Sequence, residues 1–382
     1  MPGVPFASAL SEHPLTAQAV GEVAGQVLEQ LGRNPDLAVL FITPPHGGAL
    51  EDAAAAVRAI LEPRILLGCA AVAVAGSGRE VEYEPGVSLW AGHVGDQVVP
   101  IRLGAEMDPL GPVVTGWPDD LPFEPAAVLV IADPFSFPAD ALFELVNARH
   151  PGLPVIGGMA SAARGPGGNR LALDGTVVTS GAVGAILGPA IKMNAVVSQG
   201  CRPIGTPLVV TRSEGHFVHE LAGEPPLQRL VEQAKQLSEG DIALINRGLH
   251  IGLVIDEHKV EFERGDFLIR NVFGADRETG TMQVGDEVQV GTTVQFQVRD
   301  AQSADEDLKE LLAGRTADGV LLFTCNGRGT NLFPVENHDA TVIADMLGPV
   351  PVAGFFAAGE LGPVGGRNFL HGFTASMALF ED

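Results

Sequence analysis

One short pattern occurs three times in this chain, and the repeat constrains the fold more than any other feature. In each copy a glycine follows aliphatic residues and precedes small or apolar ones, at Gly68, Gly157 and Gly354. Each glycine comes after a helix-like segment, and that segment comes after an apolar, strand-like run. A glycine-rich turn and a further strand follow it. A repeated β-α-β-β unit predicts stacked copies of one element rather than a single irregular enzyme fold.

Apolar runs delimit the three copies. The expected first strands are 37–43, 127–132 and 319–324, and the expected last strands are 87–94, 176–187 and 369–380. The helices of the first two copies are expected at 51–61 and 139–149, and each is stopped by a proline.

Other segments carry helix and strand signals of their own. Ser11 and Ser303, the latter three residues before Glu306, have the pattern of helix N-caps. Between the second and third copies we expect a hairpin over 207–221 with its turn at 212–215, a helix over 227–237, and strands over 242–256, 260–272 and 288–299. Together these elements predict an α/β fold of two modules, 1–221 and 222–382, in which mixed and antiparallel sheets are flanked by helices.

Composition and charge narrow the class of function. The 382 residues include 23 basic and 47 acidic side chains, and the net charge of −24 repels phosphate backbones and anionic lipid heads. We therefore expect neither a nucleic acid nor a membrane partner. The three cysteines, Cys69, Cys201 and Cys325, are too few for a disulfide framework and indicate a reducing, cytoplasmic compartment. The apolar stretch 176–197 is interpreted as two buried strands, because Pro189 and many small residues interrupt it.

Signals for cofactors and metals are missing. The sequence has no phosphate-binding Walker loop, no nucleophile elbow and no Cys-x-x-Cys pair. His216 and His219 lie three positions apart on an expected strand, so they face opposite sides and do not form a metal pair. We expect no cofactor and no metal.

The densest group of polar and glycine residues follows the first strand of the third copy and reads Cys325-Asn326-Gly327-Arg328-Gly329. Strand ends followed by glycine turns are where α/β sheets place ligand sites. Glycines let a ligand reach backbone amides, and an arginine fork holds a carboxylate in bidentate geometry. The last four residues of this run are therefore candidate ligand-binding residues, with an ordinary exposed turn as the alternative.

Four further residues are candidates to join this turn. Glu360 lies in the glycine-rich turn of the third copy, where it would bind an amine or be a solvated hairpin residue. His371 and Thr374 begin the expected last strand, on opposite faces. Arg270 sits in an apolar strand and needs either an acidic partner or a ligand, a salt bridge being the simpler outcome.

These motifs resemble the FIST family, named for F-box and intracellular signal transduction proteins. The N-terminal half is similar to the FIST N module in segments around residues 6–11, 67–69 and 156–160, and the C-terminal half resembles FIST C at 270–271, 322–329, 351–356, 359–363 and 370–374. The resemblance implies a sensory module that binds a small ligand, with amino acids suggested. Members are often fused to signalling domains. The two modules use up the 382 residues here, so signalling through a separate partner is expected.

Three functional hypotheses remain open. In the first, which we favour, the protein is a non-catalytic sensor in which Arg328 and nearby amides hold a carboxylate and Glu360 holds an ammonium group. In the second, it is a cysteine-dependent hydrolase or acyl transferase, with Cys325 as nucleophile, His371 as base and Glu360 or Asn326 as orienting group, although a free cysteine is more often a small buried hydrophobe. In the third, the repeats form a scaffold whose sheet edges pair in a homo-oligomer.

Overall fold

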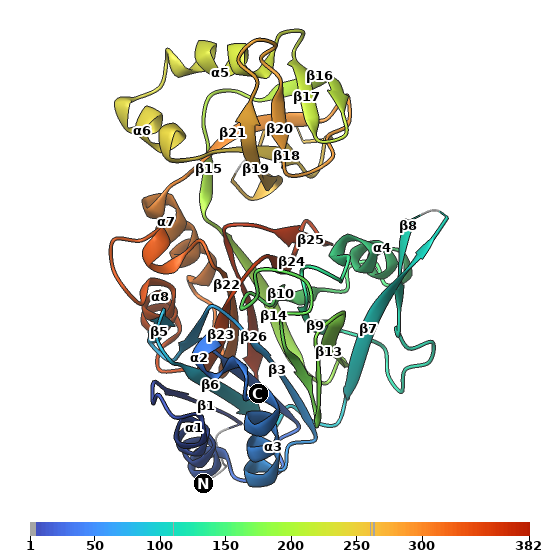
Figure 1. Ribbon diagram of the computed structural model, residues 1–382, viewed down its shortest axis with the longest axis vertical. Coiled ribbons are helices and arrows are strands. Elements are labelled where there is room, and N and C mark those ends of the chain that lie inside the picture. The colour runs from blue at the N-terminus through green and yellow to red at the C-terminus, as the bar shows by residue number, and fades with distance from the viewer. Residues whose placement is uncertain (1–4, 110, 260, 263) are drawn as a thin grey trace. The chain divides into compact units, whose positions relative to one another are not determined.

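A computed structural model describes residues 5–109, 111–259, 261–262 and 264–382, and confirms a mixed α/β fold (Figure 1). The chain divides into two compact units. The first comprises the residues up to Ser198 together with Leu308–Leu370 and Thr374–Asp382. The second comprises Gln199–Asp307 and a short insertion, His371–Phe373. The boundary predicted at residue 221 separates two sequence modules, whereas these two units are defined by their compactness in space. The units therefore do not test the predicted boundary, which stays a prediction.

The three repeats form the first unit, and each contains a parallel strand pair joined by a helix. The pairs and their helices are β2 (Leu37–Ile42), α3 (Leu50–Leu61) and β3 (Ile65–Ala70); β9 (Ala127–Ala132), α4 (Ala139–Arg149) and β10 (Val155–Met159); and β22 (Gly319–Cys325), α8 (His338–Leu347) and β23 (Val352–Ala357). Each pair is the centre of its own sheet.

Each copy gives its hairpin to the sheet of another copy. The hairpin of the first copy, β4 (Ala73–Gly76) and β5 (Arg79–Glu82), pairs with β23 of the third. The hairpin of the second, β11 (Leu171–Leu173) and β12 (Thr176–Val178), pairs with β3 of the first. The third copy closes the cycle, because its strands β24 (Glu360–Val364) and β25 (Arg367–His371) extend β10 of the second.

The remaining strands complete three sheets. The last strand of each copy, β6 (Val87–Gly92), β13 (Ala182–Leu187) or β26 (Thr374–Glu381), returns antiparallel to the first strand of its own copy. Four more strands belong to these sheets, namely β1 (Phe6–Ser11), β7 (Val98–Asp108), β8 (Gly111–Thr115) and β14 (Lys192–Gln199). The strand orders of the three sheets are β1-β6-β2-β3-β11-β12, β25-β24-β10-β9-β13-β7-β8 and β14-β26-β22-β23-β4-β5. The sheets are therefore built to one plan.

The repeated glycine has a steric cause that is the same in all three copies. Gly68, Gly157 and Gly354 stand opposite Leu40, Val130 and Leu322 on the neighbouring parallel strand. A Cβ atom at these glycines would lie 2.4, 1.8 and 2.2 Å from the carbonyl oxygens of those three residues. The backbones of each pair thus approach too closely for any side chain, which is a positional role of glycine in strands.

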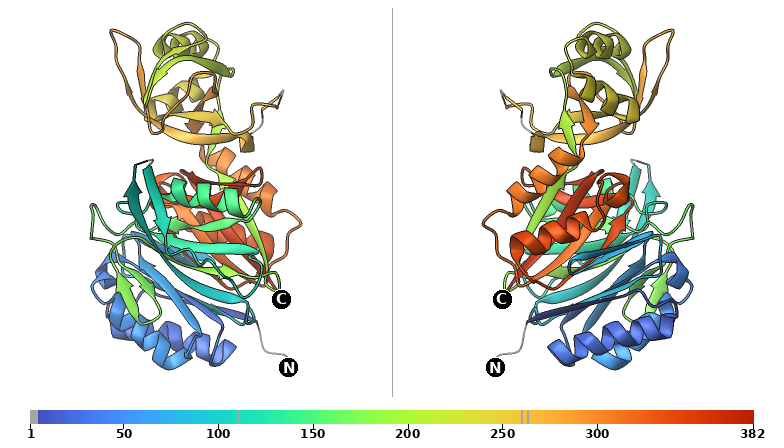
Figure 2. Two further views of the ribbon diagram at one scale, coloured as in Figure 1. Left: turned by 90° about the vertical axis from the view of Figure 1, so that its right-hand side faces the viewer. Right: turned by 90° about the vertical axis from the view of Figure 1, so that its left-hand side faces the viewer.

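Side-chain alternation along the strands separates one central core from three outer ones. On β2, residues 37, 39 and 41 point into a cluster shared by all three sheets, whereas residues 38, 40 and 42 pack beneath helices. The covering helices are α1 (Thr16–Leu31) and α3 on the first sheet, α4 on the second, and α8 with the end of α7 (Ala301–Leu312) on the third (Figures 1 and 2). The parallel strands at the centre of each sheet are buried on both faces, which explains the continuous apolar runs of the sequence.

The second unit is a closed antiparallel barrel. Its strands are β15 (Cys201–Pro203), β16 (Leu208–Glu214), β17 (Phe217–Leu221), β18 (Leu249–Val254), β19 (Phe267–Ala275), β20 (Met282–Val284) and β21 (Thr293–Arg299). The order is β15-β21-β16-β17-β20-β19-β18, and β18 also pairs with β21, which closes the ring. Helices α5 (Pro226–Ala234) and α6 (Glu239–Arg247) belong to this unit, and so do the first residues of α7, up to Asp307. Closure leaves few strand edges in this unit.

The strand predicted over 242–256 is wrong in its first half, which forms helix α6. Ser238 caps this helix: its hydroxyl accepts from the Asp241 N–H at 3.1 Å, and Asp241 accepts in return from the Ser238 N–H. This is a capping box that uses Asp at the third position. Within 242–256, the only strand is β18 (Leu249–Val254). Residues 260 and 263 of the next predicted strand lie outside the described residues, and β19 begins at Phe267.

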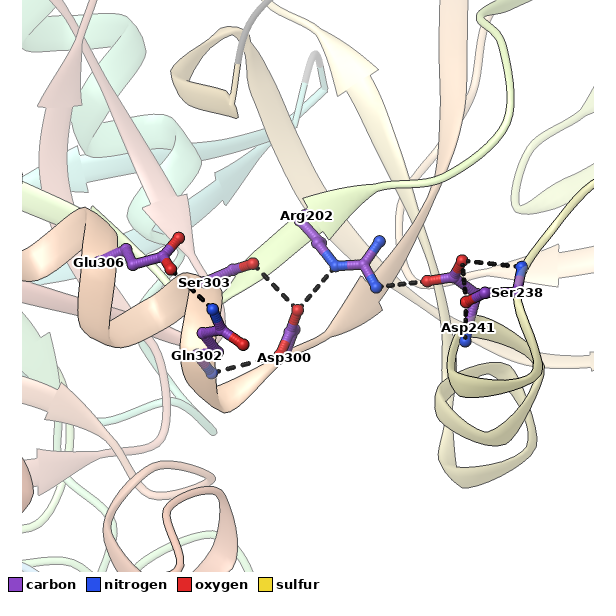
Figure 3. A network of polar contacts seen from close by, with 7 residues as sticks. All are labelled: Arg202, Ser238, Asp241, Asp300, Gln302, Ser303 and Glu306. Carbon is purple, nitrogen blue, oxygen red and sulfur yellow. Dashed lines mark hydrogen bonds and ion pairs between the residues drawn. The ribbon is translucent and has the colours of Figure 1, made fainter.

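The capping box predicted at Ser303 is also wrong, because α7 begins two residues earlier. Asp300 accepts hydrogen bonds from the Gln302 N–H at 3.2 Å and the Ser303 hydroxyl at 3.0 Å. Arg202 of β15 joins Asp300 to Asp241 (Figure 3). Asp300 therefore has the capping role, and Ser303 lies inside the helix.

Smaller differences occur at element ends. Helix α1 starts at Thr16 without a side-chain cap, whereas Ser11 is the last residue of β1. Strand β16 runs to Glu214, so the hairpin turns at Gly215, which has a φ of 54°. The stretch 176–197 forms strands, as predicted, but it contains β12, β13 and part of β14, and of these only β13 is buried throughout. Among the described residues, no helix has the length and apolar character needed to cross a membrane.

Candidate functional site

The candidate turn follows the carboxyl end of β22, as predicted. Cys325 is the last residue of that strand, and its thiol receives a hydrogen bond from the Gly327 N–H at 3.4 Å. Asn326 is exposed, whereas Arg328 and Gly329 are buried. Two neighbouring strands start at this end of the first unit, since β24 begins at Glu360 and β26 at Thr374.

Most backbone amides of the turn already have acceptors within the protein. The N–H of Asn326 donates to the Ala357 carbonyl at 2.8 Å, and that of Arg328 to the Cys325 carbonyl at 2.8 Å. The N–H of Thr330 donates to Glu82 at 3.0 Å. The expected cradle of open amides is therefore largely occupied by the fold itself.

Arg328 is fully buried, and its fork is occupied by Asp339. Its Nε and Nη2 atoms donate to the two carboxylate oxygens at 2.8 and 2.7 Å. Burial alone would raise the pKa of Asp339, but the charge and hydrogen bonds of Arg328 outweigh it and hold that pKa well below its usual range. The expectation that this fork is open to a ligand carboxylate is corrected accordingly. Only Nη1 has no hydrogen-bond partner among the described residues.

The Arg328–Asp339 pair is the centre of a packed structural group. The guanidinium lies 5.1 Å from the centre of the Phe333 ring, and the His338 ring stacks on the same phenyl ring with centroids 3.4 Å apart. The Thr324 hydroxyl donates to Asp339 at 2.7 Å. These contacts connect the turn to strand β22 and to the start of α8, so Arg328 anchors the loop.

The exchanged hairpin of the first copy also holds this loop. Glu82 accepts hydrogen bonds from the N–H and hydroxyl of Thr330 at 3.0 and 2.9 Å. Glu80 accepts from the Ala340 N–H at 2.9 Å, at the start of α8. Burial, and then the nearby negative charge of Asp339, raise the pKa of Glu80 to about 8. A carboxyl group of the first copy is thus mostly neutral at pH 7 inside the site of the third.

Glu360 is fully buried in strand β24 and is not a solvated turn residue. Its Oε2 atom accepts hydrogen bonds from the N–H and hydroxyl of Thr374 at 3.1 and 2.9 Å. Its Oε1 atom has no partner of ordinary hydrogen-bond geometry among the described residues. Burial raises the pKa of Glu360 to about 8, against the opposing effects of Thr374, Cys325 and Arg328. Cys325, Arg328, Glu360 and Thr374 therefore come together in the first unit.

Two predicted site residues belong to the second unit. Arg270 donates from Nε to Asp286 at 2.7 Å, which is the salt bridge expected as the simpler outcome. His371 is buried and ends strand β25. The prediction that it begins the last strand with Thr374 is wrong, because Gly372 and Phe373 form the turn between β25 and β26.

Comparison with known proteins identifies the family. The family model described as FIST N domain matches residues 36–224, and the model described as FIST C domain matches residues 227–363. The chain belongs to the FIST family. FIST domains are sensory domains of signal transduction. An uncharacterised protein of Mycobacterium bovis is 46% identical over 381 residues, which cover 97% of each chain. An uncharacterised protein of Mycobacterium tuberculosis is 45% identical over 380 residues, or 98% of each.

Several residues of this FIST chain that shape the site were not singled out from the sequence. Asp339 is one, although a buried arginine requires an acidic partner and Asp339 stands in the first turn of the next helix. Glu80 and Glu82 are others, and their role depends on a hairpin exchange between distant copies. The FIST C match includes Arg328, Asp339 and Glu360 but not these two hairpin residues.

Proposed function

We propose that this FIST chain is a small-ligand-binding sensory protein that recognises an amino acid or a small carboxylate and acts through a separate signalling partner. The observation that supports it best is the Oε1 atom of Glu360, which is buried and has no partner of ordinary hydrogen-bond geometry in the part of the chain that the structure describes. A buried polar atom left unpaired costs about 1–3 kcal/mol, so its retention calls for a reason.

The ligand chemistry follows from two buried atoms of the first unit that have no partner of ordinary hydrogen-bond geometry among the described residues. Glu360 presents one carboxyl oxygen, which would take a ligand ammonium group. Arg328 has one guanidinium nitrogen, Nη1, without a hydrogen-bond partner among the described residues, and its N–H groups would donate to a ligand carboxylate. The remaining atoms of both side chains are used by Thr374 and Asp339. By this proposal Oε1 of Glu360 and Nη1 of Arg328 recognise the two ends of a zwitterion.

A thermal-shift screen of amino acids and small carboxylates tests the proposal. A ligand present at about 100 times its Kd adds about 2.7 kcal/mol, which raises the Tm by a few degrees. We expect the hit to be lost in Glu360→Gln and kept in Asp133→Asn. Asp133 is a matched control because it is a buried carboxyl just beyond β9, the corresponding strand of the second copy. A broad panel without any hit, or a hit unaffected by Glu360→Gln, would refute the proposal.

The protonation of Glu360 gives a second test, by calorimetry. With its pKa near 8, the carboxyl is mostly neutral at pH 7, and an ammonium ligand prefers the ionised form. Binding at pH 7 should therefore release a proton, and affinity should rise as the pH approaches 8. Titrations in two buffers of different ionisation enthalpy measure this proton. Proton uptake would instead indicate a carboxylate at Glu360.

Cysteine chemistry is the second candidate, and one observation favours it. The Gly327 N–H donates to the Cys325 sulfur, which stabilises a thiolate. All three cysteines are buried, so a hydrolase or acyl transferase built on Cys325 requires iodoacetamide to label this thiol before Cys69 and Cys201. Equal or slower labelling of Cys325 would exclude it.

A further inference from the structure

Three residues leave the first unit and return to it. The chain belongs to the first unit up to Leu370, contributes His371–Phe373 to the second, and rejoins the first at Thr374. We name His371–Phe373 the strap. It joins the end of β25 to the start of β26. The next residue, Thr374, donates hydrogen bonds to the Glu360 carboxyl group, which is the candidate ligand-binding group.

The residue after the strap, Thr374, makes two hydrogen bonds to Glu360. Both donors come from Thr374, whose N–H and hydroxyl reach Oε2 at 3.1 and 2.9 Å. Thr374 is almost fully buried, at 1% exposure. A change in the charge or position of the Glu360 carboxyl therefore acts on the backbone amide next to the strap.

Within the second unit, the strap is held by the ring of Phe373. This ring meets His250 edge-on, with centroids 4.5 Å apart, and the Arg299 guanidinium lies 4.8 Å from its centre. It packs against the small cluster of Cys201, Val254, Phe267 and Ile269. His250 is buried, and its ring is in contact with Phe373 on one side and hydrogen-bonded to Asn271 and the Gly248 backbone.

Phe373 also has a strained backbone. Its φ is 65°, in the left-handed region that costs a residue other than glycine of order 1–3 kcal/mol. The adjacent Gly372 would take such a φ without cost, yet the strain falls on the aromatic residue. A change of this φ would move the Phe373 ring relative to His250, so the backbone strain and the ring contact are linked.

We infer that the strap couples the ligand site to the barrel of the second unit, with Thr374 sensing the Glu360 carboxyl and Phe373 changing its packing on His250 in response. The inference rests on the proposed function, since the ligand is taken to act at Glu360. It adds the regulation of that site: ligand binding is read by strands β18 and β19 of the barrel. A signalling partner would then respond to the barrel.

Hydrogen exchange of the full chain tests the coupling without a ligand. Thr374→Val removes one hydrogen bond to Glu360 and keeps the backbone amide. We expect amides of β18 and β19 to exchange roughly three to ten times faster, the range that corresponds to one hydrogen bond. Thr324→Val is the matched control, because Thr324 is equally buried in the first unit and donates to Asp339 at 2.7 Å. That control should leave the barrel amides unchanged.

A second variant removes the strap's ring. Phe373→Gly accepts the left-handed φ without strain and cannot pack on His250, so in this background Thr374→Val should have no further effect on β18 and β19. The inference is overturned if Thr374→Val leaves the barrel unchanged, if Thr324→Val changes it equally, or if the effect persists with Phe373→Gly. An empty ligand screen would refute the proposed function but would not alter this result, so the two failures are distinguishable.

Discussion

Glu360 and Glu80 are two carboxyl groups that the fold keeps mostly protonated at neutral pH. Both have a pKa of about 8, with burial as the largest cause. In the unfolded chain a glutamate ionises near pH 4.5, so between about pH 4.5 and 8 the native state holds more protons than the unfolded state. Their contribution to stability is complete below about pH 4.5 and is lost as the pH rises through 8.

Glu360→Gln should flatten this dependence. The amide keeps the shape of the side chain but does not ionise. Between pH 5 and 9 the free energy of unfolding should therefore fall less in the variant than in wild type, by a few kcal/mol. Urea denaturation at pH 5, 7 and 9 measures this. The exposed Glu29→Gln change is the control and should follow the wild-type profile. Identical slopes for wild type and Glu360→Gln would contradict the raised pKa.

Arg328 is expected to matter first for stability. Arg328→Ala leaves Asp339 as a buried, unpaired charge, which costs about 3–5 kcal/mol, and Arg328→Lys loses the bidentate geometry. Replacing both partners by apolar residues, as in Arg328→Met with Asp339→Leu, should recover much of the loss. Denaturant midpoints report these changes.

The control for this series is Arg33→Ala. Arg33 forms an ion pair with Glu62 in which both side chains are 53% exposed, so its loss should cost less than about 1 kcal/mol. A similar small loss for Arg328→Ala would show that the buried pair is not an anchor.

At the scale of the element, the parallel strand pairs depend on three equivalent glycines. Gly354→Ala would place a Cβ atom 2.2 Å from the Leu322 carbonyl oxygen, and the neighbouring strand would have to shift. We expect a loss of several kcal/mol, because overpacking in a filled core typically costs about 1–3 kcal/mol even without a backbone clash. Thermal denaturation measures the loss.

Gly21→Ala is the matched control for the glycine series. Gly21 lies in helix α1, and a Cβ atom there would meet nothing within 4 Å. Since alanine is favoured over glycine in helices by roughly 0.5–1 kcal/mol, this variant should be slightly more stable than wild type. If Gly354→Ala were tolerated as well, the close approach of β22 and β23 would not be rigid.

The elements themselves were largely predictable, because strands buried on both faces give continuous apolar runs and the glycines mark their register. The partners of the hairpins were not. The sequence of β4 and β5 predicts a hairpin, but nothing local indicates that it pairs with β23, about 275 residues away. For the same reason Glu360 was expected in a solvated turn: its Gly-Glu-Leu-Gly-Pro context is typical of turns, and only its pairing beside Gly158 of another copy buries it.

At the scale of the whole molecule, the first unit depends on both ends of the sequence. Aromatic contacts of the central core join the two ends: Phe41 packs on Phe323 and Phe355, and Trp90 packs on Phe380 at 5.1 Å. A fragment of residues 1–221 would lack these partners and expose the inner face of its first sheet.

We therefore expect fragment 1–221 to show no cooperative thermal transition and to bind a hydrophobic dye. Refolding it together with fragment 222–382 should restore the transition, because the missing strands β22 to β26 are then supplied. Circular dichroism in the near ultraviolet and dye fluorescence report both results. A cooperative transition of 1–221 alone would contradict the interdependence of the two ends.

The cyclic exchange of hairpins also sets the order in which a ribosome can complete this molecule. The strands β4 and β5 are synthesised early, but their partner β23 emerges more than 270 residues later. During that interval their backbone edges are unpaired, and such edges are prone to pair with other chains. The second sheet likewise waits for β24, near the C-terminus. Translation must therefore be nearly finished before two of the three sheets can close, and the nascent chain should depend on chaperones that shield exposed strands.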